Sequence, residues 1–157
     1  ILIVDDVEDN RLIAQLYLKH LPYRLSFAQN GLEALERVSR NRPDLIVIDM
    51  HMPKMSGYEA VEEIRRRERF EGLAPTPIIA LTASALREDA ERSLAAGCTI
   101  HLTKPISRER LQRAILEVTP DVADSTGGVE PGETIYLKRG LQTLIPSFRA
   151  NTLRDLE

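Results

Sequence analysis

The chain has 157 residues, of which 43% are hydrophobic and 29% are charged, a composition that suits one compact domain with some additional sequence. Its formal net charge is -3 and its basic residues are scattered, which argues against a nucleic-acid-binding surface. The single cysteine, Cys98, can form no internal disulfide, and no apolar run approaches the ~20 residues that span a bilayer. We therefore expect a soluble segment in a reducing, cytoplasmic setting, with no nucleic acid and no membrane as partner.

Five short apolar segments, each bounded by turn residues, are the expected strands of the chain. They cover residues 1–4, 24–28, 45–49, 78–82 and 100–103. Four of the five consist mainly of Ile, Val, Leu and Ala, the composition of strands that are covered on both faces. Because the first segment opens the chain without an initiator Met or a preceding turn, we expect the chain to be part of a longer protein.

The segments between these strands have apolar residues at helical spacing. The recurring positions are Leu12, Ile13, Leu16 and Tyr17, then Leu32, Leu35 and Val38, and then Tyr58, Val61 and Ile64. Two more helices are expected at 88–96, ended by Gly97, and from the N-cap residue Ser107 to about Val118. This alternation predicts an α/β domain over residues 1–118, with a doubly wound, five-stranded parallel sheet.

A different composition follows the last of these helices. Residues 119–132 lack apolar periodicity and are rich in Pro, Gly, Ser, Thr and Asp, so we interpret them as a linker. Residues 133–157 are expected to form a helical extension because they carry an apolar stripe. The stripe comprises Leu141, Leu144, Ile145, Phe148, Leu153 and Leu156.

Polar side chains follow four of the five expected strands. Asp5 and Asp6 follow the first strand, Asp49 ends the third, Thr82 ends the fourth and Lys104 follows the fifth. The carboxyl ends of parallel strands meet at one edge of a sheet, where ligands bind, so we expect these side chains in one pocket. Three carboxylates in one pocket repel each other unless they are protonated or bind a hard divalent cation, and an oxygen-only ligand set favours Mg²⁺.

This combination of groups suits phosphoryl chemistry. A carboxylate can act as the nucleophile toward a phosphoryl group and form an acyl phosphate. Mg²⁺ would neutralise the developing charge, Lys104 would pair with phosphoryl oxygens, and the Thr82 hydroxyl would donate a hydrogen bond. Positioning and electrostatics are sufficient for such a transfer.

Four short motifs at these strand ends resemble those of the response-regulator receiver family of two-component signalling. They are VDD at 4–6, DMHMPKMSG at 49–57, LTA at 81–83 and TKP at 103–105. The resemblance covers residues 1 to about 118 and implies the flavodoxin-like fold with strand order 2-1-3-4-5. It also implies a phosphorelay in which a histidine kinase or a histidine phosphotransfer domain donates the phosphoryl group.

The resemblance implies a role for each acidic residue of the site. Asp49 is the expected phosphoacceptor. Asp6 and Asp49 are expected to bind Mg²⁺ directly, Asp5 to act largely through bound water, and His51 to provide its main-chain carbonyl. Only the main chain of His51 is required, so its unusual side chain does not weaken the assignment.

The later motifs supply the remaining expected roles. Thr82 and Lys104 would hold the phosphoryl group, and the peptide bond between Lys104 and Pro105 is expected to be cis. The switch position of the family, usually Tyr or Phe, falls on His101. We expect this imidazole to turn inward on phosphorylation and to shift an existing conformational equilibrium.

Several alternatives remain open from the sequence. A pseudo-receiver that signals without phosphorylation is disfavoured by the complete acidic set. An aspartyl-phosphate phosphatase would need a second acid two residues after the nucleophile, where this chain has His51. We do not expect the fragment to be an enzyme, beyond assisting its own phosphorylation and dephosphorylation.

The end of the chain allows two interpretations. Residues 141–157 are similar to the opening helix of histidine phosphotransfer domains, which favours a hybrid histidine kinase as the parent protein. They could instead form an accessory helix that docks on the receiver or on a second copy of it, giving a homodimer. An amphipathic pattern by itself does not distinguish the two.

Overall fold

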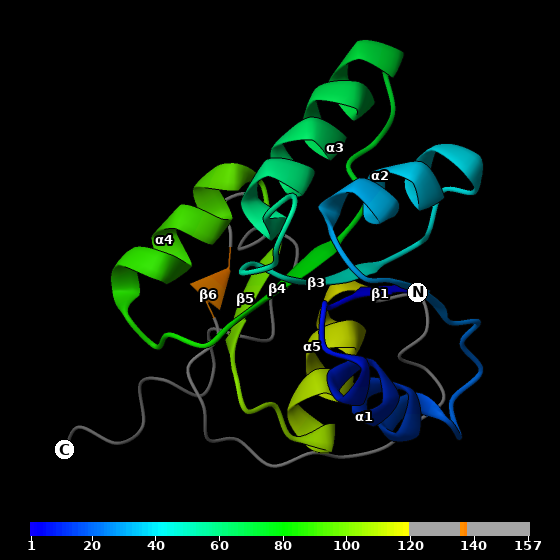
Figure 1. Cartoon of the computed structure of the whole chain (residues 1–157), viewed down its shortest axis with the longest axis vertical. Coiled ribbons are helices and arrows are strands. Elements are labelled where there is room, and N and C mark those ends of the chain that lie inside the picture. The colour runs from blue at the N-terminus through cyan, green and yellow to red at the C-terminus, as the bar shows by residue number, and fades with distance from the viewer. Residues whose placement is uncertain (120–135, 138–157) are drawn as a thin grey trace, which may run out of the picture.

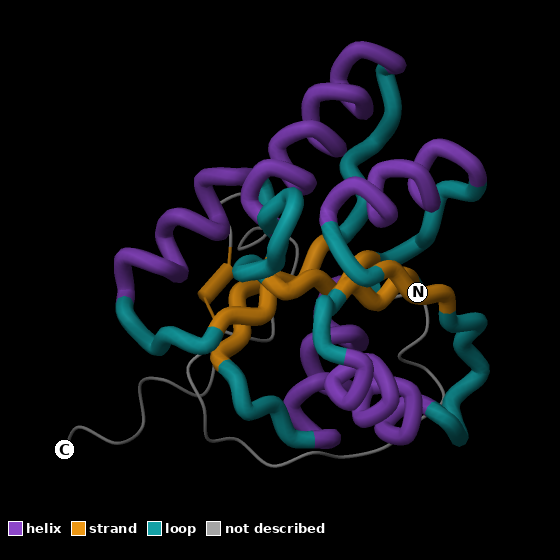
Figure 2. The backbone as a smooth tube through the Cα atoms, viewed as in Figure 1, coloured by secondary structure: helices purple, strands orange, loops and turns teal. Residues whose placement is uncertain are grey.

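The computed structural model describes residues 1–119 and 136–137, which form six strands and five helices (Figures 1 and 2). The strands are β1 (Leu2–Val4), β2 (Ser26–Ala28), β3 (Ile46–Asp49), β4 (Ile78–Thr82), β5 (Ile100–Thr103) and β6 (Tyr136–Leu137). The helices are α1 (Glu8–Leu18), α2 (Gly31–Arg40), α3 (Gly57–Glu71), α4 (Arg87–Ala96) and α5 (Arg108–Val118). Every strand and helix predicted over residues 1–118 is present.

All the strands belong to one sheet, in the order β2-β1-β3-β4-β5-β6. Strands β1 to β5 are parallel to one another and have the predicted order. β6 pairs antiparallel with β5, which the sequence did not predict. Helices α2, α3 and α4 cover one face of the sheet and α1 and α5 cover the other (Figure 1). The domain therefore has the doubly wound, flavodoxin-like fold.

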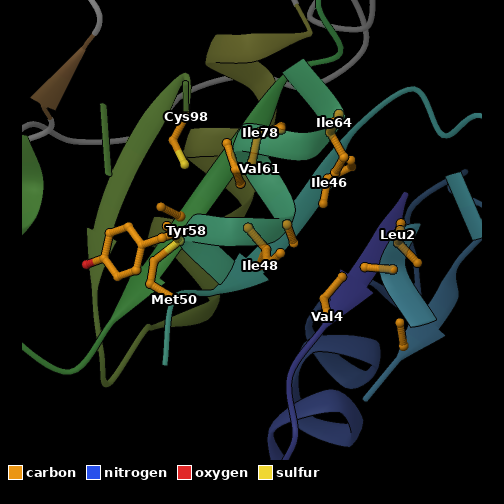
Figure 3. Packing of buried hydrophobic residues seen from close by; sticks show 14 of the residues in the cluster. Leu2, Val4, Ile46, Ile48, Met50, Tyr58, Val61, Ile64, Ile78 and Cys98 are labelled. Carbon is orange, nitrogen blue, oxygen red and sulfur yellow. The ribbon is translucent and has the colours of Figure 1, made fainter. Parts of the chain in front are cut away.

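The core has two layers because alternate strand residues point to opposite faces of the sheet. Ile46 and Ile48 of β3 belong to the layer beneath α2 and α3, part of which Figure 3 shows. Val47, between them in sequence, belongs to the layer beneath α1 and α5. Full burial of such a side chain contributes about 1.5–3 kcal/mol, so both helical layers are held by the strands they cover.

The helix ends follow local sequence signals. Ser56 and Glu59 form a capping box at the start of α3, and the Ser107 hydroxyl accepts a hydrogen bond from the Arg110 N–H at the start of α5. Gly97 ends α4 with a φ of 118°, as predicted. Gly57 begins α3 so close to β3 that an added Cβ would lie 2.3 Å from the main-chain oxygen of Asp49. Only glycine allows this approach.

The basic run at 65–69 contains a buried ion pair between Arg65 and Glu68. Its pattern is typical of a solvated helix face, but Arg65 and Glu68 are buried, with 9% and 5% exposure. The Arg65 guanidinium donates to Glu68 Oε2 at 2.6 Å, to the Thr76 carbonyl at 2.7 Å and to the Gly97 carbonyl at 2.9 Å. This network joins α3 to the segments that enter β4 and β5, which local sequence could not show.

The predicted linker at 119–132 and helical extension at 133–157 fall outside the described residues, except for Thr119 and β6. Both assignments stay predictions. Over the described part of the chain, none of the helices is long and apolar enough to cross a membrane.

Candidate functional site

The sheet brings the polar strand ends together at one edge. Val4 is the register partner of Ile48, Asp49 of Leu81, and Thr82 of Thr103, so β1, β3, β4 and β5 end side by side. Asp5 and Asp6 follow β1, Asp49 and Thr82 are the last residues of β3 and β4, and Lys104 follows β5.

Lys104 links two of the acidic residues directly. Its Nζ lies 2.7 Å from Asp5 Oδ2 and 2.7 Å from Asp49 Oδ2, although Asp5 and Lys104 are 99 residues apart in sequence. The two carboxylate side chains are only 3% and 9% exposed. Burial by itself lowers the pKa of Lys104, but hydrogen bonds and charge from Asp49 and Asp5 outweigh it and raise the pKa above its ordinary value. The ammonium is therefore fully charged at neutral pH.

A third carboxylate completes an acidic cluster. Oxygen atoms of Asp5, Asp6 and Asp49 all lie within 4.8 Å of one another, and Asp6 is exposed where the other two are buried. One ammonium against three carboxylates leaves negative charge that a cation can balance. Carboxylate oxygens are the ligands that Mg²⁺ prefers, and one exposed carboxylate leaves access from solvent. The residues present thus fit a magnesium ion.

Hydrogen bonds distinguish the two buried carboxylates. Asp5 Oδ1 accepts from the Val7 N–H at 2.9 Å and from Asn10 Nδ2 at 3.0 Å, and Asn10 also lies 3.2 Å from Oδ2. Asp49 Oδ1 accepts only from the His51 N–H, at 2.9 Å, among the contacts of the described residues. With Lys104 on each Oδ2, Asp5 is the more completely satisfied carboxylate. Asp49 retains more lone-pair capacity for a new bond.

Thr82 ends β4, the strand next to β3, and Pro105 follows β5, the next strand along the sheet. The Thr82 side chain is fully buried, and its Oγ1 accepts from the Ser84 N–H at 3.3 Å. The Lys104 N–H donates to the Thr82 carbonyl at 2.7 Å, which ties the β5 end to the β4 end. The peptide bond between Lys104 and Pro105 is cis.

His101 lies in β5, apart from the acidic cluster and against α4. It is 2% exposed, and its Nδ1 lies 3.2 Å from the hydroxyl of Ser93 in α4. Burial lowers the pKa of His101; Asp89 opposes this shift and Arg110 adds to it. The imidazole is therefore neutral at pH 7, and its contacts connect β5 with α4.

Sequence reasoning missed Asn10. Its amide holds the Asp5 carboxylate from the first turn of α1, five residues further along the chain. A polar residue on the first turn after the acidic pair was the available signal. An Asn at this position has many ordinary uses in a helix, so the tertiary structure was needed to identify this one.

Comparison with known proteins agrees with this site. The model of the response regulator receiver domain family matches residues 1–116. The sensor histidine kinase GacS of Pseudomonas protegens is 33% identical over 144 residues, which cover 92% of this chain and 16% of the kinase. This chain spans 27% or less of the length of GacS and of two other long signalling relatives.

Two solved structures extend the likeness to three dimensions. The receiver domain of Ssk1 from Saccharomyces cerevisiae, crystallised with the histidine phosphotransfer protein Ypd1, is 34% identical, with a TM-score of 0.74 over 78% of this chain and 89% of that one. The receiver domain of sensor histidine kinase PA1611 from Pseudomonas aeruginosa, with magnesium in its active-site cleft, is 37% identical, with a TM-score of 0.68 over 76% and 95%.

The chain belongs to the response regulator receiver domains. It is a receiver domain of two-component signalling.

Proposed function

We propose that Asp49 accepts a phosphoryl group from a phosphohistidine of a histidine kinase or histidine phosphotransfer domain. The observation that carries the proposal is the Lys104 ammonium placed 2.7 Å from both Asp5 and Asp49, beside a third carboxylate. Of the two buried carboxylates, Asp49 accepts fewer hydrogen bonds, so we assign it as the nucleophile. Asp6, Asp49 and the main-chain carbonyl of His51 would hold Mg²⁺ directly, and Asp5 through water.

The transfer exchanges one bond to phosphorus for another. An Asp49 carboxylate oxygen forms the new P–O bond, the P–N bond to the donor imidazole breaks, and its electron pair leaves with the imidazole. Mg²⁺ would supply neutralisation of negative charge on the phosphoryl oxygens. Lys104 can move from Asp49 Oδ2 to a phosphoryl oxygen, since Asp49 loses its charge when it is acylated, and Thr82 donates a hydrogen bond.

The donor would approach along α1. This helix begins at Glu8, close to Asp5 and Asp6. Three of its apolar residues are 43% to 51% exposed: Leu12, Ile13 and Leu16. Ile13, Asp5 and Lys104 line one cavity of about 400 Å³. An apolar face beside a charged site suits a helical partner that presents its histidine to Asp49. The Ssk1 receiver, which was solved with the phosphotransfer protein Ypd1, supports this kind of partner.

The proposal also covers the parent protein and the switch residue. The parent protein is a longer signalling protein of the hybrid histidine kinase kind, in which this domain accepts the phosphoryl group in a relay. The similarity to the sensor histidine kinase GacS supports this context. His101 is the switch residue, and its contact with Ser93 gives it a route to α4.

Incubation with Mg²⁺ and a small phosphodonor such as acetyl phosphate tests the proposal. Intact-protein mass spectrometry should show a gain of one phosphoryl group in the wild type. The isosteric variant Asp49→Asn should show none, while Asp44→Asn, outside the cluster, should be phosphorylated normally. A pseudo-receiver would gain no mass in any variant, and repeated turnover of an external phosphomonoester would instead indicate a phosphatase.

A further inference from the structure

Three side chains form a column that runs from the loop after Asp49 to helix α4. The rings of His51 and Tyr58 meet nearly at right angles, with centroids 5.8 Å apart and an interplanar angle of 82°. The guanidinium carbon of Arg92, in α4, lies 4.0 Å from the centroid of the Tyr58 ring. Neither the phosphoryl chemistry nor the switch position accounts for this His51–Tyr58–Arg92 column.

Tyr58 is the buried centre of the column. It lies in the first turn of α3, is 5% exposed and packs in the core beside Met50 (Figure 3). Its neighbour Gly57 lies so close to the end of β3 that an added Cβ would be 2.3 Å from the Asp49 main-chain oxygen, and the Gly57 N–H donates to the Met50 carbonyl at 3.1 Å. The Tyr58 hydroxyl is buried and has no hydrogen-bond partner among the described residues. Tyr58 therefore contacts His51 and Arg92 through its aromatic ring and not through its hydroxyl.

Helix α4 has few buried side chains of its own. No side chain caps its N-terminus, and the flanking residue Leu86 is 66% exposed. Only Ala90 and Ser93 are buried within the helix. A cation over an aromatic face contributes about 0.5–1 kcal/mol at an exposed site, so the contact of Arg92 with Tyr58 is one of the links between α4 and α3.

We propose that the His51–Tyr58–Arg92 column positions the His51 main chain for Mg²⁺ and couples the metal site to α4. His51 already donates its N–H to Asp49 Oδ1, and its carbonyl is a proposed metal ligand. Its ring contacts Tyr58, so His51 joins the acidic site, through its main chain, to the column, through its side chain. The inference rests on the proposed function of the acidic cluster.

Coupling between two sites is reciprocal. If Mg²⁺ at the acidic cluster changes α4, a change at Arg92 must alter the affinity for Mg²⁺. A cation–π contact of this kind corresponds to a change of about two- to fivefold in affinity. We therefore expect Arg92→Gln to weaken Mg²⁺ binding by about two- to fivefold.

The sign of this effect separates positioning from charge. Removing a positive charge near an acidic cluster lowers electrostatic competition, so a purely electrostatic role for Arg92 predicts tighter Mg²⁺ binding. Arg87→Gln provides the matched control, because Arg87 lies in the same helix and its side chain is 80% exposed. Arg92→Lys retains a cation for the Tyr58 face and should restore wild-type affinity.

NMR titration with MgCl₂ measures both parts of the proposal. In the wild type, amides of the β3–α3 loop and of α4 should shift with one dissociation constant. In Arg92→Gln and Tyr58→Leu, the loop shifts should persist with weaker affinity, and the α4 shifts should fall to about half or less. Phosphorylation by acetyl phosphate, followed by mass, serves as an independent check of the site.

Each outcome bears on a different claim. If the wild type gains no phosphoryl group, the proposed function fails. If the wild type is phosphorylated but Arg92→Gln binds Mg²⁺ as tightly as wild type or tighter, or keeps its α4 shifts, the column has no coupling role. Since Arg92 is exposed, its variants should fold even if Tyr58→Leu does not, and they suffice to decide the matter.

Discussion

Replacement of Lys104 by Met should destabilise the domain strongly in the absence of Mg²⁺. The substitution keeps the length of the side chain and removes the ammonium that lies 2.7 Å from Asp5 and Asp49, leaving two buried carboxylates without their cation. Loss of one partner of a buried ion pair costs about 3–5 kcal/mol. The Lys104 side chain is 24% exposed, so solvent reduces the effect, and we expect a loss of about 2–3 kcal/mol.

Mg²⁺ should reverse much of this loss. A ligand that binds only the folded state stabilises it by an amount that grows with the ratio of its concentration to its dissociation constant. The variant has no ammonium to compete with Mg²⁺ at the cluster, so Mg²⁺ should bind it more tightly and stabilise it more than the wild type. The difference in unfolding free energy should therefore narrow as MgCl₂ is added.

Urea unfolding followed by far-ultraviolet circular dichroism measures both quantities, and is preferred because the chain contains no tryptophan. Arg40→Gln is the control, since its ion pair with Glu36 is exposed and should contribute little. A loss below about 1 kcal/mol in Lys104→Met would show that the carboxylates do not depend on Lys104. Equal stabilisation of variant and wild type by MgCl₂ would show that the ammonium and the metal do not share a site.

The pH dependence of this contribution has a definite direction. The pKa of Lys104 is raised above 10.5 in the folded state, so its stabilising effect is complete below the pKa of the unfolded chain. It is lost only as the pH rises through the higher folded-state value. The destabilisation by Lys104→Met should therefore be the same at pH 7 and pH 9.

Three other predictions concern stability, each measured by urea unfolding. Burial lowers the pKa of His101 below 6.5 in the folded state, so in acid the unfolded chain binds more protons than the folded chain. The wild-type free energy of unfolding should therefore fall, relative to that of His101→Phe, as the pH drops from about 6.5 to the folded-state pKa of His101. Gly57→Ala would place a Cβ 2.3 Å from the Asp49 main-chain oxygen, and it should cost about 1–3 kcal/mol and slow phosphorylation. Arg65→Ala should cost about 2–4 kcal/mol, because it removes the 2.6 Å ion pair with buried Glu68 and leaves that carboxylate only the longer contact with Arg42, at 3.3 Å, as an ion pair. The exposed Arg66→Ala should change little.

Each of these has an outcome that would contradict its reasoning. Parallel pH profiles for the wild type and His101→Phe would mean that the imidazole does not titrate differently on unfolding. A stable, normally phosphorylated Gly57→Ala would mean that α3 does not need its close approach to β3. Similar losses for Arg65→Ala and Arg66→Ala would mean that burial of Arg65 contributes nothing.

The sequence predicted the sheet because the relevant signals are local. Each strand of the parallel sheet is a short apolar segment between turn residues, and the chain enters and leaves its helices at residues such as Ser107 and Gly97. The polar strand ends could also be read locally, since parallel strands must end at the same edge. The sequence alone therefore predicts that Asp49 and Lys104 lie in one pocket.

Other features depend on partners that are distant in sequence. Arg65 has the pattern of a surface residue, yet it is buried because Gly97 and Thr76 offer carbonyls to it from other segments. The pairing of β6 with β5 likewise requires an edge that only the assembled sheet provides. Helical periodicity predicts which apolar residues of a helix are buried. It does not predict which polar groups of other segments a charged residue of that helix will contact.

What the sequence by itself determined is the alternation of strands and helices, the edge at which the acidic residues gather, and the chemistry that those residue types allow. Only the tertiary structure decided that Lys104 lies between Asp5 and Asp49, that Asn10 holds Asp5, and that His51 contacts α4 through Tyr58. The physical reason is that strand and helix formation depend mainly on neighbouring residues. Hydrogen bonds, ion pairs and ring contacts depend on ångström-scale distances that exist only after distant segments have packed together.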